Sequence, residues 1–251
     1  MRILYPSLPY EPRTIDPLWE PEYSWARQQG FTAELFDVET EQIVPRSATP
    51  EPALYRGWML SAGEYESLAA LTPLLVSPTD YLASHQASGW YEAIAEFTFP
   101  STFQPAAQLP DFAAGQRYFV KGLVKSFGVD SVVSSAEQWR ALLARHEIPA
   151  AETLFVRRFA ELEPDSEQRF FVVAGVAYGA AGTGLPAALA PVLSRLKKHK
   201  FYSLDVARTI PGGSVVVEVG DGQVSDLKEW KLADFGATVL GALAAATKAR
   251  S

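Results

Sequence analysis

Two carboxylates stand out in the stretch FYSLDVARTIPGGSVVVEVGDGQ, residues 201–223. Its two halves are apolar and suit β-strands, and Pro followed by Gly-Gly suits the tight turn of a hairpin. A four-residue turn over 210–213 would place Asp205 directly opposite Glu218. Opposed residues have Cβ atoms about 5 Å apart, so two negative charges at these positions would repel each other.

A positive group between the two acids would remove this repulsion. Mg²⁺ suits the position, because it binds one or two carboxylates and leaves room for phosphate oxygens. The alternative is that one acid points to solvent or pairs with a Lys or Arg. Without any cation, the repulsion should raise the pKa of one acid and cost stability near neutral pH. The hairpin alone leaves metal binding and ordinary ion pairing open.

The composition excludes several classes of protein. The chain has 251 residues, of which 48% are hydrophobic and 20% charged, and its net charge of −7 argues against a general affinity for nucleic acid or anionic membranes. The absence of Cys excludes disulfides and thiolate nucleophiles, and three widely separated His argue against a His-ligated zinc site. No apolar run suits a membrane span and no signal peptide is expected, so we expect a cytoplasmic protein; its oligomeric state stays open.

The first 97 residues show a β-α-β-β-α-β pattern, which predicts a small N-terminal α/β domain over 1–97. A helical linker over 79–97 closes this domain. The expected strands are 2–5, 31–38, 53–60 and 74–78, and the expected helices are 22–29 and 62–73.

From residue 98 onward, longer strands alternate with hairpin signals and helices, which predicts an α+β unit over 98–251. The expected strands are 118–122, 131–133, 154–159, 170–176, 201–207 and 214–219, and the expected helices are 135–146, 185–198 and 232–249.

Four motifs occur in a fixed order within 98–230. They are YFVKGLVKSFG, LFVRRF, EQRFFVVAGVAYG and the two-acid hairpin. This succession resembles the ATP-grasp superfamily, and the N-terminal unit resembles the small α/β domain that precedes its nucleotide-binding unit. The resemblance implies an α+β ATP-grasp fold that binds ATP and Mg²⁺.

The resemblance assigns phosphate contacts to charged residues of the first and third motifs. Lys121 matches the strand lysine that contacts nucleotide phosphates, and Lys125 is a second candidate in the following loop. Arg169 matches a triphosphate ligand, and Glu167 a ribose contact. The ordinary alternatives are a surface lysine with a buried stem and surface ion pairing.

The second motif corresponds to the hinge that holds the adenine. The resemblance implies that backbone groups around Arg157 and Arg158 bind the adenine edge, while Phe155 or Phe159 forms an apolar wall beside Val156. The alternative is a half-buried strand that carries two exposed arginines.

Asp205 and Glu218 match the carboxylates that bind Mg²⁺ in this superfamily. The usual third ligand is an Asn two residues after the Glu, where this chain has Gly220, so Asp221 is the expected substitute. A lysine common upstream in the superfamily is also absent from the corresponding segment, SHQASGWYE.

The resemblance implies a ligase that joins a carboxylate to an amine, each from a small molecule or a peptide. The carboxylate attacks the γ-phosphorus of ATP, and an amine displaces phosphate from the resulting acylphosphate. Lys121 and Arg169 would neutralise phosphate charge during this reaction. Two alternatives stay open, namely a kinase that phosphorylates a hydroxyl and a degenerate nucleotide-binding module without turnover.

Overall fold

Three β-sheets organise the protein. The computed structural model describes residues 1–49, 51–210 and 212–248. Within these residues, one sheet has five strands and the other two have four strands each.

The N-terminal sheet is built around a buried central strand. It contains β1 (Arg2–Leu8), β2 (Glu11–Ile15), β3 (Thr32–Asp37), β4 (Gln42–Val44) and β5 (Ala53–Tyr55). Strands β3 and β5 run parallel to β1, whereas β2 pairs antiparallel with β1 and β4 pairs antiparallel with β3. The helices of this part are α1 (Glu20–Gln28), α2 (Ala62–Leu71), α3 (Pro78–His85) and α4 (Ala87–Ile94).

The predicted strand at 74–78 is wrong. Leu74 forms only an isolated bridge with Ala53, and the chain then enters α3. The Ser77 hydroxyl accepts a hydrogen bond from Asp80 N, and Pro78 occupies the first helical position, where its missing N–H costs nothing. Strands β2 and β4 had no counterpart in the prediction, because β2 is largely polar and β4 has only three residues.

The central sheet has the order β11-β10-β12-β13 and the third sheet the order β6-β9-β7-β8. Their strands are β6 (Ser101–Pro105), β7 (Tyr118–Lys121), β8 (Val132–Val133), β9 (Thr153–Arg158), β10 (Gln168–Val173), β11 (Val176–Gly179), β12 (Phe201–Arg208) and β13 (Ser214–Asp221). The helices are α5 (Ala136–Arg145), α6 (Ala190–Arg195), α7 (Leu232–Phe235), a π-helical turn (Gly236–Leu240) and α8 (Gly241–Lys248), with 3₁₀ turns at Ala95–Phe97, Ala113–Gly115, Gly128–Ser131, Ala180–Gly182 and Ala187–Leu189.

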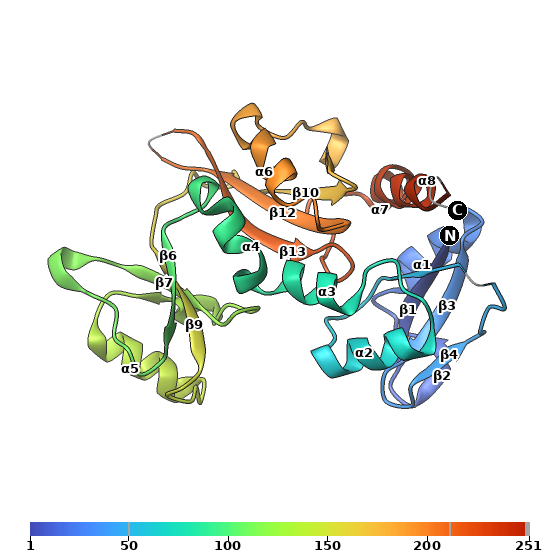
Figure 1. The fold of residues 1–251 in the computed structure, drawn as a ribbon, viewed down its shortest axis with the longest axis horizontal. Coiled ribbons are helices and arrows are strands. Elements are labelled where there is room, and N and C mark those ends of the chain that lie inside the picture. Colours follow the sequence, from blue (N-terminus) through green and yellow to red (C-terminus); the bar gives the residue numbers. More distant parts are fainter. Residues whose placement is uncertain (50, 211, 249–251) are drawn as a thin grey trace.

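The sheets lie in three lobes that follow one another across the molecule (Figure 1). The third sheet and α5 form the lobe at the left, the central sheet lies in the middle, and the N-terminal sheet lies at the right. Helices α3 and α4 pass across the middle lobe, and α7 and α8 return the chain to the N-terminal sheet. The first strand, β1, and the last helix, α8, therefore belong to the same lobe.

The hydrophobic cores explain this return. The core of the N-terminal lobe also contains Phe171, Trp230 and Phe235 from the second half of the chain. A second core packs α4 and α6 on the central sheet, and a third packs α5 on the sheet that contains β9. Residues of the second half of the chain thus complete the core of the N-terminal lobe. The division of the chain into domains at residues 97 and 98 stays a prediction.

A buried arginine joins the N-terminal lobe to the segment that follows β13. The Arg56 guanidinium donates to both carboxylate oxygens of Glu22 at 2.9 and 2.8 Å. Its Nη1 also donates to the carbonyl oxygens of Gly222, Gln223 and Ser225 at 2.8, 3.0 and 3.2 Å. Arg56 is fully buried, so these five hydrogen bonds compensate for the loss of its hydration.

Candidate active site

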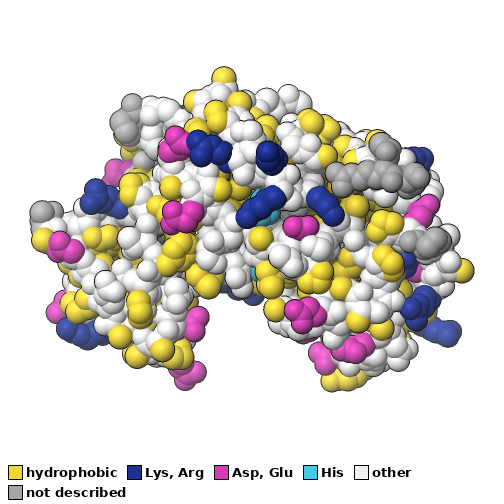
Figure 2. Space-filling view, viewed as in Figure 1, with side chains coloured by type: hydrophobic (Ala, Val, Ile, Leu, Met, Phe, Trp, Pro, Cys, Tyr) yellow, Lys and Arg dark blue, Asp and Glu magenta, His cyan; other side chains and the backbone are white. Residues whose placement is uncertain are grey.

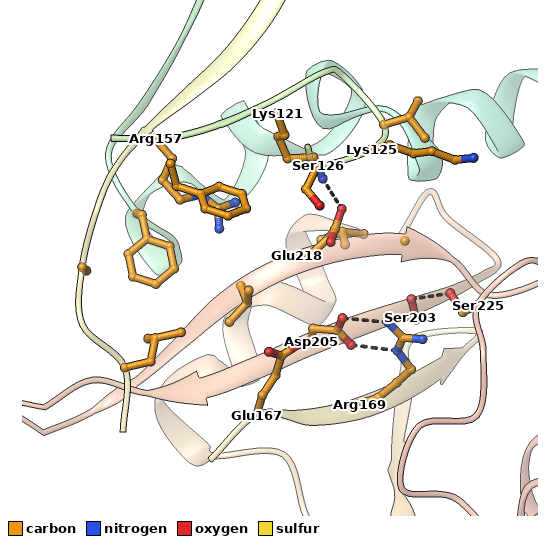
Figure 3. Close-up of a pocket in the computed structure, with 18 of the residues that line it drawn as sticks. Lys121, Lys125, Ser126, Arg157, Glu167, Arg169, Ser203, Asp205, Glu218 and Ser225 are labelled. Carbon is orange, nitrogen blue, oxygen red and sulfur yellow. Dashed lines mark hydrogen bonds and ion pairs between the residues drawn. The ribbon is translucent and has the colours of Figure 1, made fainter. Parts of the chain in front are cut away.

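One cleft of about 1020 Å³ lies between the central sheet and the sheet that contains β7 and β9. Both sheets direct charged side chains into this cleft (Figure 3). Ten of the twelve site residues predicted from the sequence line it: Lys121, Lys125, Arg157, Arg158, Phe159, Glu167, Arg169, Asp205, Glu218 and Asp221. Phe155 and Val156 are instead buried in the cores on either side of β9.

The hairpin places Asp205 opposite Glu218, as its sequence predicts. Near the turn, however, the pairing differs from the one that a four-residue turn predicts. There each residue of β12 faces the residue of β13 one position earlier than expected, so that Ala207 faces Val215. A β-bulge next to Asp205 then restores the register by adding one residue to β13. The two acids consequently point to the same face of the central sheet.

Asp205 is held by two cations. The Arg169 Nε and Nη2 donate to its two carboxylate oxygens at 2.8 and 2.7 Å, and Lys228 Nζ donates to the second at 2.9 Å. Burial opposes ionisation of Asp205, but hydrogen bonds from Arg169 and Lys228 outweigh it and lower the pKa of this acid. The expected rise in pKa from unrelieved repulsion is therefore not seen at Asp205.

Glu218 has its own cation, because Lys121 Nζ donates to its carboxylate across the cleft (Figure 3). Lys121 is 5% exposed, whereas the Glu218 side chain is 40% exposed. Lys125 is exposed and points away from this pair in the same view. Without a ligand, both acids are therefore ion-paired, as the alternative interpretation of the hairpin predicts. Both also line the cleft.

Arg157 carries a buried charge without an ion-pair partner among the described residues. Its guanidinium lies 5.0 Å from the ring centre of Phe99 and 5.5 Å from that of Phe155, and its Nε has no hydrogen-bond partner. Burial lowers the pKa of Arg157 to about 10. The next residue, Arg158, is exposed, and Phe159 is half-buried. The two arginines therefore differ, and only Arg157 presents a desolvated cation to the cleft.

Asp221 does not join the other two acids. Strand alternation directs it to the opposite face of β13 from Glu218, and its carboxylate accepts hydrogen bonds from Ser84 Oγ at 2.9 Å and from Gln223 N at 2.9 Å and Nε2 at 3.1 Å. Within the described part of the chain, no three His, Cys, Asp or Glu side chains form a group that could hold a metal ion. The structure thus brings Asp205 and Glu218 together, whereas Asp221 borders the cleft but directs its side chain to the other face of β13.

Asp221 should make stability depend on pH. Burial raises the pKa of this carboxyl to about 7, although hydrogen bonds from Ser84 and Gln223 oppose the rise. An Asp in the unfolded chain titrates near pH 3.9, so the native state binds this proton more tightly and stability falls as pH rises from about 4 to about 7. We expect Asp221→Asn to remove this fall, and urea unfolding at pH 5 and pH 8 measures it.

The comparison of the two proteins at each pH cancels the contributions of other groups. The stability of Asp221→Asn relative to the parent should therefore increase between pH 5 and pH 8. A difference that is the same at both pH values would show that Asp221 is ionised throughout.

Three side chains of the cleft region were not predicted as site residues. Lys228, from the segment after β13, bridges Asp205 and Glu167, to which it donates at 2.9 and 2.5 Å. His85 lines the cleft and stacks on the Tyr81 ring, and burial together with repulsion from two lysines lowers its pKa to about 4. Ser203, two residues before Asp205 on the same face of β12, follows the alternation that could have identified it.

The surface shows a mixture of charges. Figure 2 shows acidic and basic side chains interspersed on one face, with an indentation between the lobe at the left and the N-terminal lobe at the right. Across residues 1–49, 51–210 and 212–248, no helix is both long and apolar enough to cross a membrane.

The sequence matches a known protein family. The family described as ATP-grasp domain, R2K clade family 3, matches residues 56–244, so the chain belongs to the ATP-grasp family. Among curated proteins, none matches the sequence.

Solved structures show the same fold. D-cycloserine synthetase DcsG is 14% identical, with a TM-score of 0.68 over 98% of this chain and 100% of that chain. An ATP-grasp RimK domain protein from Sphaerobacter thermophilus DSM 20745 is 18% identical, with a TM-score of 0.65 over 98% of each chain. The ATP-grasp ligase PsnB, in complex with the precursor peptide PsnA2 and AMPPNP, is 11% identical, with a TM-score of 0.58 over 99% of this chain and 96% of that chain. These matches confirm the predicted α+β ATP-grasp fold.

Proposed function

We propose that the protein is an Mg²⁺-dependent ligase that uses ATP to join a carboxylate to an amine through an acylphosphate. One observation carries this proposal: two opposed carboxylates and the phosphate-binding candidates Lys121 and Arg169 face one cleft. Membership of the ATP-grasp family supports ATP as the nucleotide.

The two opposed acids fit a hard divalent cation. Asp205 and Glu218 offer carboxylate oxygens, which Mg²⁺ prefers, and three cationic side chains now occupy them: Lys121, Arg169 and Lys228. Each acid therefore already lies beside positive charge. When bound there, Mg²⁺ would neutralise charge on the phosphate oxygens.

The cationic side chains supply the remaining charge neutralisation. Lys121 Nζ would exchange the Glu218 carboxylate for a phosphate oxygen, because the lysine stem is long and mobile. Arg169 would approach the triphosphate from Asp205, with Glu167 near the ribose and Lys125 at the cleft edge. The backbone of 155–159 would hold the adenine, with Arg157 and Arg158 on this strand.

The reaction proceeds in two steps. A carboxylate oxygen of the first substrate attacks the γ-phosphorus, the bond to the β-phosphate oxygen breaks, and ADP leaves. The amine nitrogen of the second substrate then attacks the acyl carbon, phosphate leaves, and the nitrogen loses a proton. The protein contributes positioning and charge neutralisation rather than a covalent intermediate.

The substrates fall into two classes, small molecules and peptides. A precursor peptide bound to the structurally similar ligase PsnB supports the peptide class, and the synthetase DcsG supports small molecules. A screen for ADP release with pooled amino acids and peptides tests the proposal. Hydroxylamine, which converts an acylphosphate into a hydroxamate, should trap the intermediate in reactions that contain the carboxylate substrate alone.

The screen also separates the two alternatives. A kinase would release ADP with a hydroxyl substrate, form a stable phosphorylated product and yield no hydroxamate. A degenerate binding module would bind nucleotide and release no ADP with any mixture. Either result would contradict the ligase proposal.

Nucleotide binding should stabilise the fold. Mg²⁺ with AMPPNP at 100 times its Kd adds about 2.7 kcal/mol to the free energy of unfolding, which corresponds to a rise in Tm of about 5–10 °C. Lys121→Ala should remove most of this rise, because its ammonium would bind the phosphates, whereas the exposed Lys197→Ala serves as control. A full rise in Lys121→Ala would remove Lys121 from the nucleotide site.

A further inference from the structure

A pair of hydroxyl groups lies beside the two acids of the hairpin. Ser203 and Gly220 are directly opposed, two residues along the strands from Asp205 and Glu218, so the two pairs share one face of the sheet. The Ser203 Oγ lies 2.7 Å from the Ser225 Oγ, and both serines line the cleft (Figure 3). Four positions of the hairpin thus form one patch that contains two carboxylates, a hydroxyl and a bare glycine.

The hydroxyl pair occupies the space that a side chain at position 220 would need. A Cβ atom on Gly220 would lie 2.8 Å from Ser203 Oγ and 3.3 Å from Ser225 Oγ. The glycine and the serines therefore belong together, because a larger residue at 220 would displace the hydroxyls.

The direction of the hydrogen bonds defines what Ser203 can bind. Ser225 Oγ lies 2.8 Å from the carbonyl oxygen of Asp221, which can only accept, so the hydroxyl hydrogen of Ser225 is used there. Ser203 must then be the donor in its contact with Ser225. Its oxygen consequently has no hydrogen left for the cleft and can act there only as an acceptor.

An oxygen that can only accept, and that lies beside two carboxylates, can bind a cation or a hydrogen-bond donor. Building on the proposed function, we propose that Ser203 Oγ is the third acceptor oxygen of the cation site, where it faces the hydration shell of the Mg²⁺ held by Asp205 and Glu218. Ser225 is its positioning residue, because it fixes the direction of the Ser203 hydroxyl. Mg²⁺ keeps several waters when few carboxylates bind it, so a short neutral side chain suffices at this position.

Calorimetry on the full chain tests this inference. Mg²⁺ is titrated into protein saturated with AMPPNP, and AMPPNP is titrated separately in EDTA. Ser203→Ala should weaken Mg²⁺ binding about tenfold, the range for a lost partner around a metal site, and leave metal-free AMPPNP binding unchanged. Ser214→Ala, at the start of the same strand as Glu218, is the matched control.

A second variant supplies the missing acceptor oxygen in another way. Ser203→Ala/Gly220→Asn removes the Oγ that the new Cβ would meet at 2.8 Å and adds an amide oxygen on the same face, so it should regain the lost Mg²⁺ affinity. Melting temperatures without ligand show whether each variant is folded.

Each other outcome is distinct. Unchanged Mg²⁺ affinity in Ser203→Ala would overturn the inference, and a raised KM for the amine substrate in that variant would then assign the hydroxyl to the amine. Equal weakening of metal-free AMPPNP binding would also overturn it. Failure of the parent protein to bind Mg²⁺ with AMPPNP would instead overturn the proposed function on which the inference rests.

Discussion

Glu218→Gln should lower Mg²⁺-dependent ADP release by at least about a hundredfold and raise the Mg²⁺ concentration needed for half-maximal rate. An amide is a poorer ligand than a carboxylate for a hard cation, and Glu218 is one of only two acids at the proposed site. Even the loss of a partner that merely orients a metal ligand costs 10- to 100-fold, so the loss of a ligand should cost more. Initial rates across a Mg²⁺ titration measure both effects.

The stability of this variant distinguishes a metal ligand from a structural partner. Without ligand, Glu218 pairs with the buried Lys121, and Gln retains an oxygen that can accept from the lysine. The variant should therefore lose only about 1 kcal/mol of unfolding free energy. Glu163→Gln, at an exposed pair with Arg208, is the control. A loss of several kcal/mol with an unchanged Mg²⁺ requirement would make Glu218 a structural partner of Lys121.

The hairpin shows how far local patterns in the sequence reach. Apolar alternation and the Pro-Gly-Gly turn were sufficient to place Asp205 opposite Glu218. They did not reveal the bulge, because a bulge adds a residue without changing the pattern of side-chain types. The register was correct because a turn that is longer by one residue and the bulge compensate each other.

The partners of these acids could not be predicted in the same way. Lys228 reaches Asp205 from the irregular segment after β13, and Lys121 reaches Glu218 from another sheet. No periodicity links such positions, because their proximity arises when the sheets pack around the cleft. The order of motifs predicted that Lys121, Arg169 and the acids share a site, but it did not predict which cation pairs with which acid.

Asp221 was predicted to replace the metal ligand that is missing at position 220, because it is the next residue in the sequence. It is adjacent to Gly220, and in a loop it could have taken the place of a ligand there. In a strand, a shift of one residue moves the side chain to the other face, and Asp221 instead bonds with Ser84 and Gln223. The strand continues to Asp221, two residues past the predicted end at 219, so strand alternation applies to both Gly220 and Asp221.

Local patterns could not predict the Arg56 contacts for the same reason, although Arg56 itself lies in a segment, 53–60, that was predicted as a strand. Its partners are 34 positions upstream and at least 166 positions downstream in the sequence. Its guanidinium also lies 5.3 Å from the Trp19 ring centre and 4.8 Å from that of Phe235. Elements from both ends of the chain thus converge on one cation.

Arg56→Ala should therefore lower the free energy of unfolding by about 3–5 kcal/mol, because it leaves the buried Glu22 without its counter-charge. Three carbonyl oxygens of the segment after β13 would also lose their donor. Urea unfolding measures the effect. Arg145→Ala removes an exposed ion pair with Asp130 and should cost less than about 1 kcal/mol, so it controls for the loss of an arginine.

A double variant separates charge from packing at the same place. Arg56→Met/Glu22→Leu removes both charges together, so it should be more stable than Arg56→Ala, because no carboxylate is left buried without a partner. The segment after β13 carries Ser225 and Lys228, which reach the cleft through Ser203 and Asp205. If Arg56 positions this segment, the double variant should regain stability and still show weakened Mg²⁺ binding with AMPPNP. Full recovery of Mg²⁺ binding would show that packing alone holds the segment in place, and that Arg56 contributes only to stability.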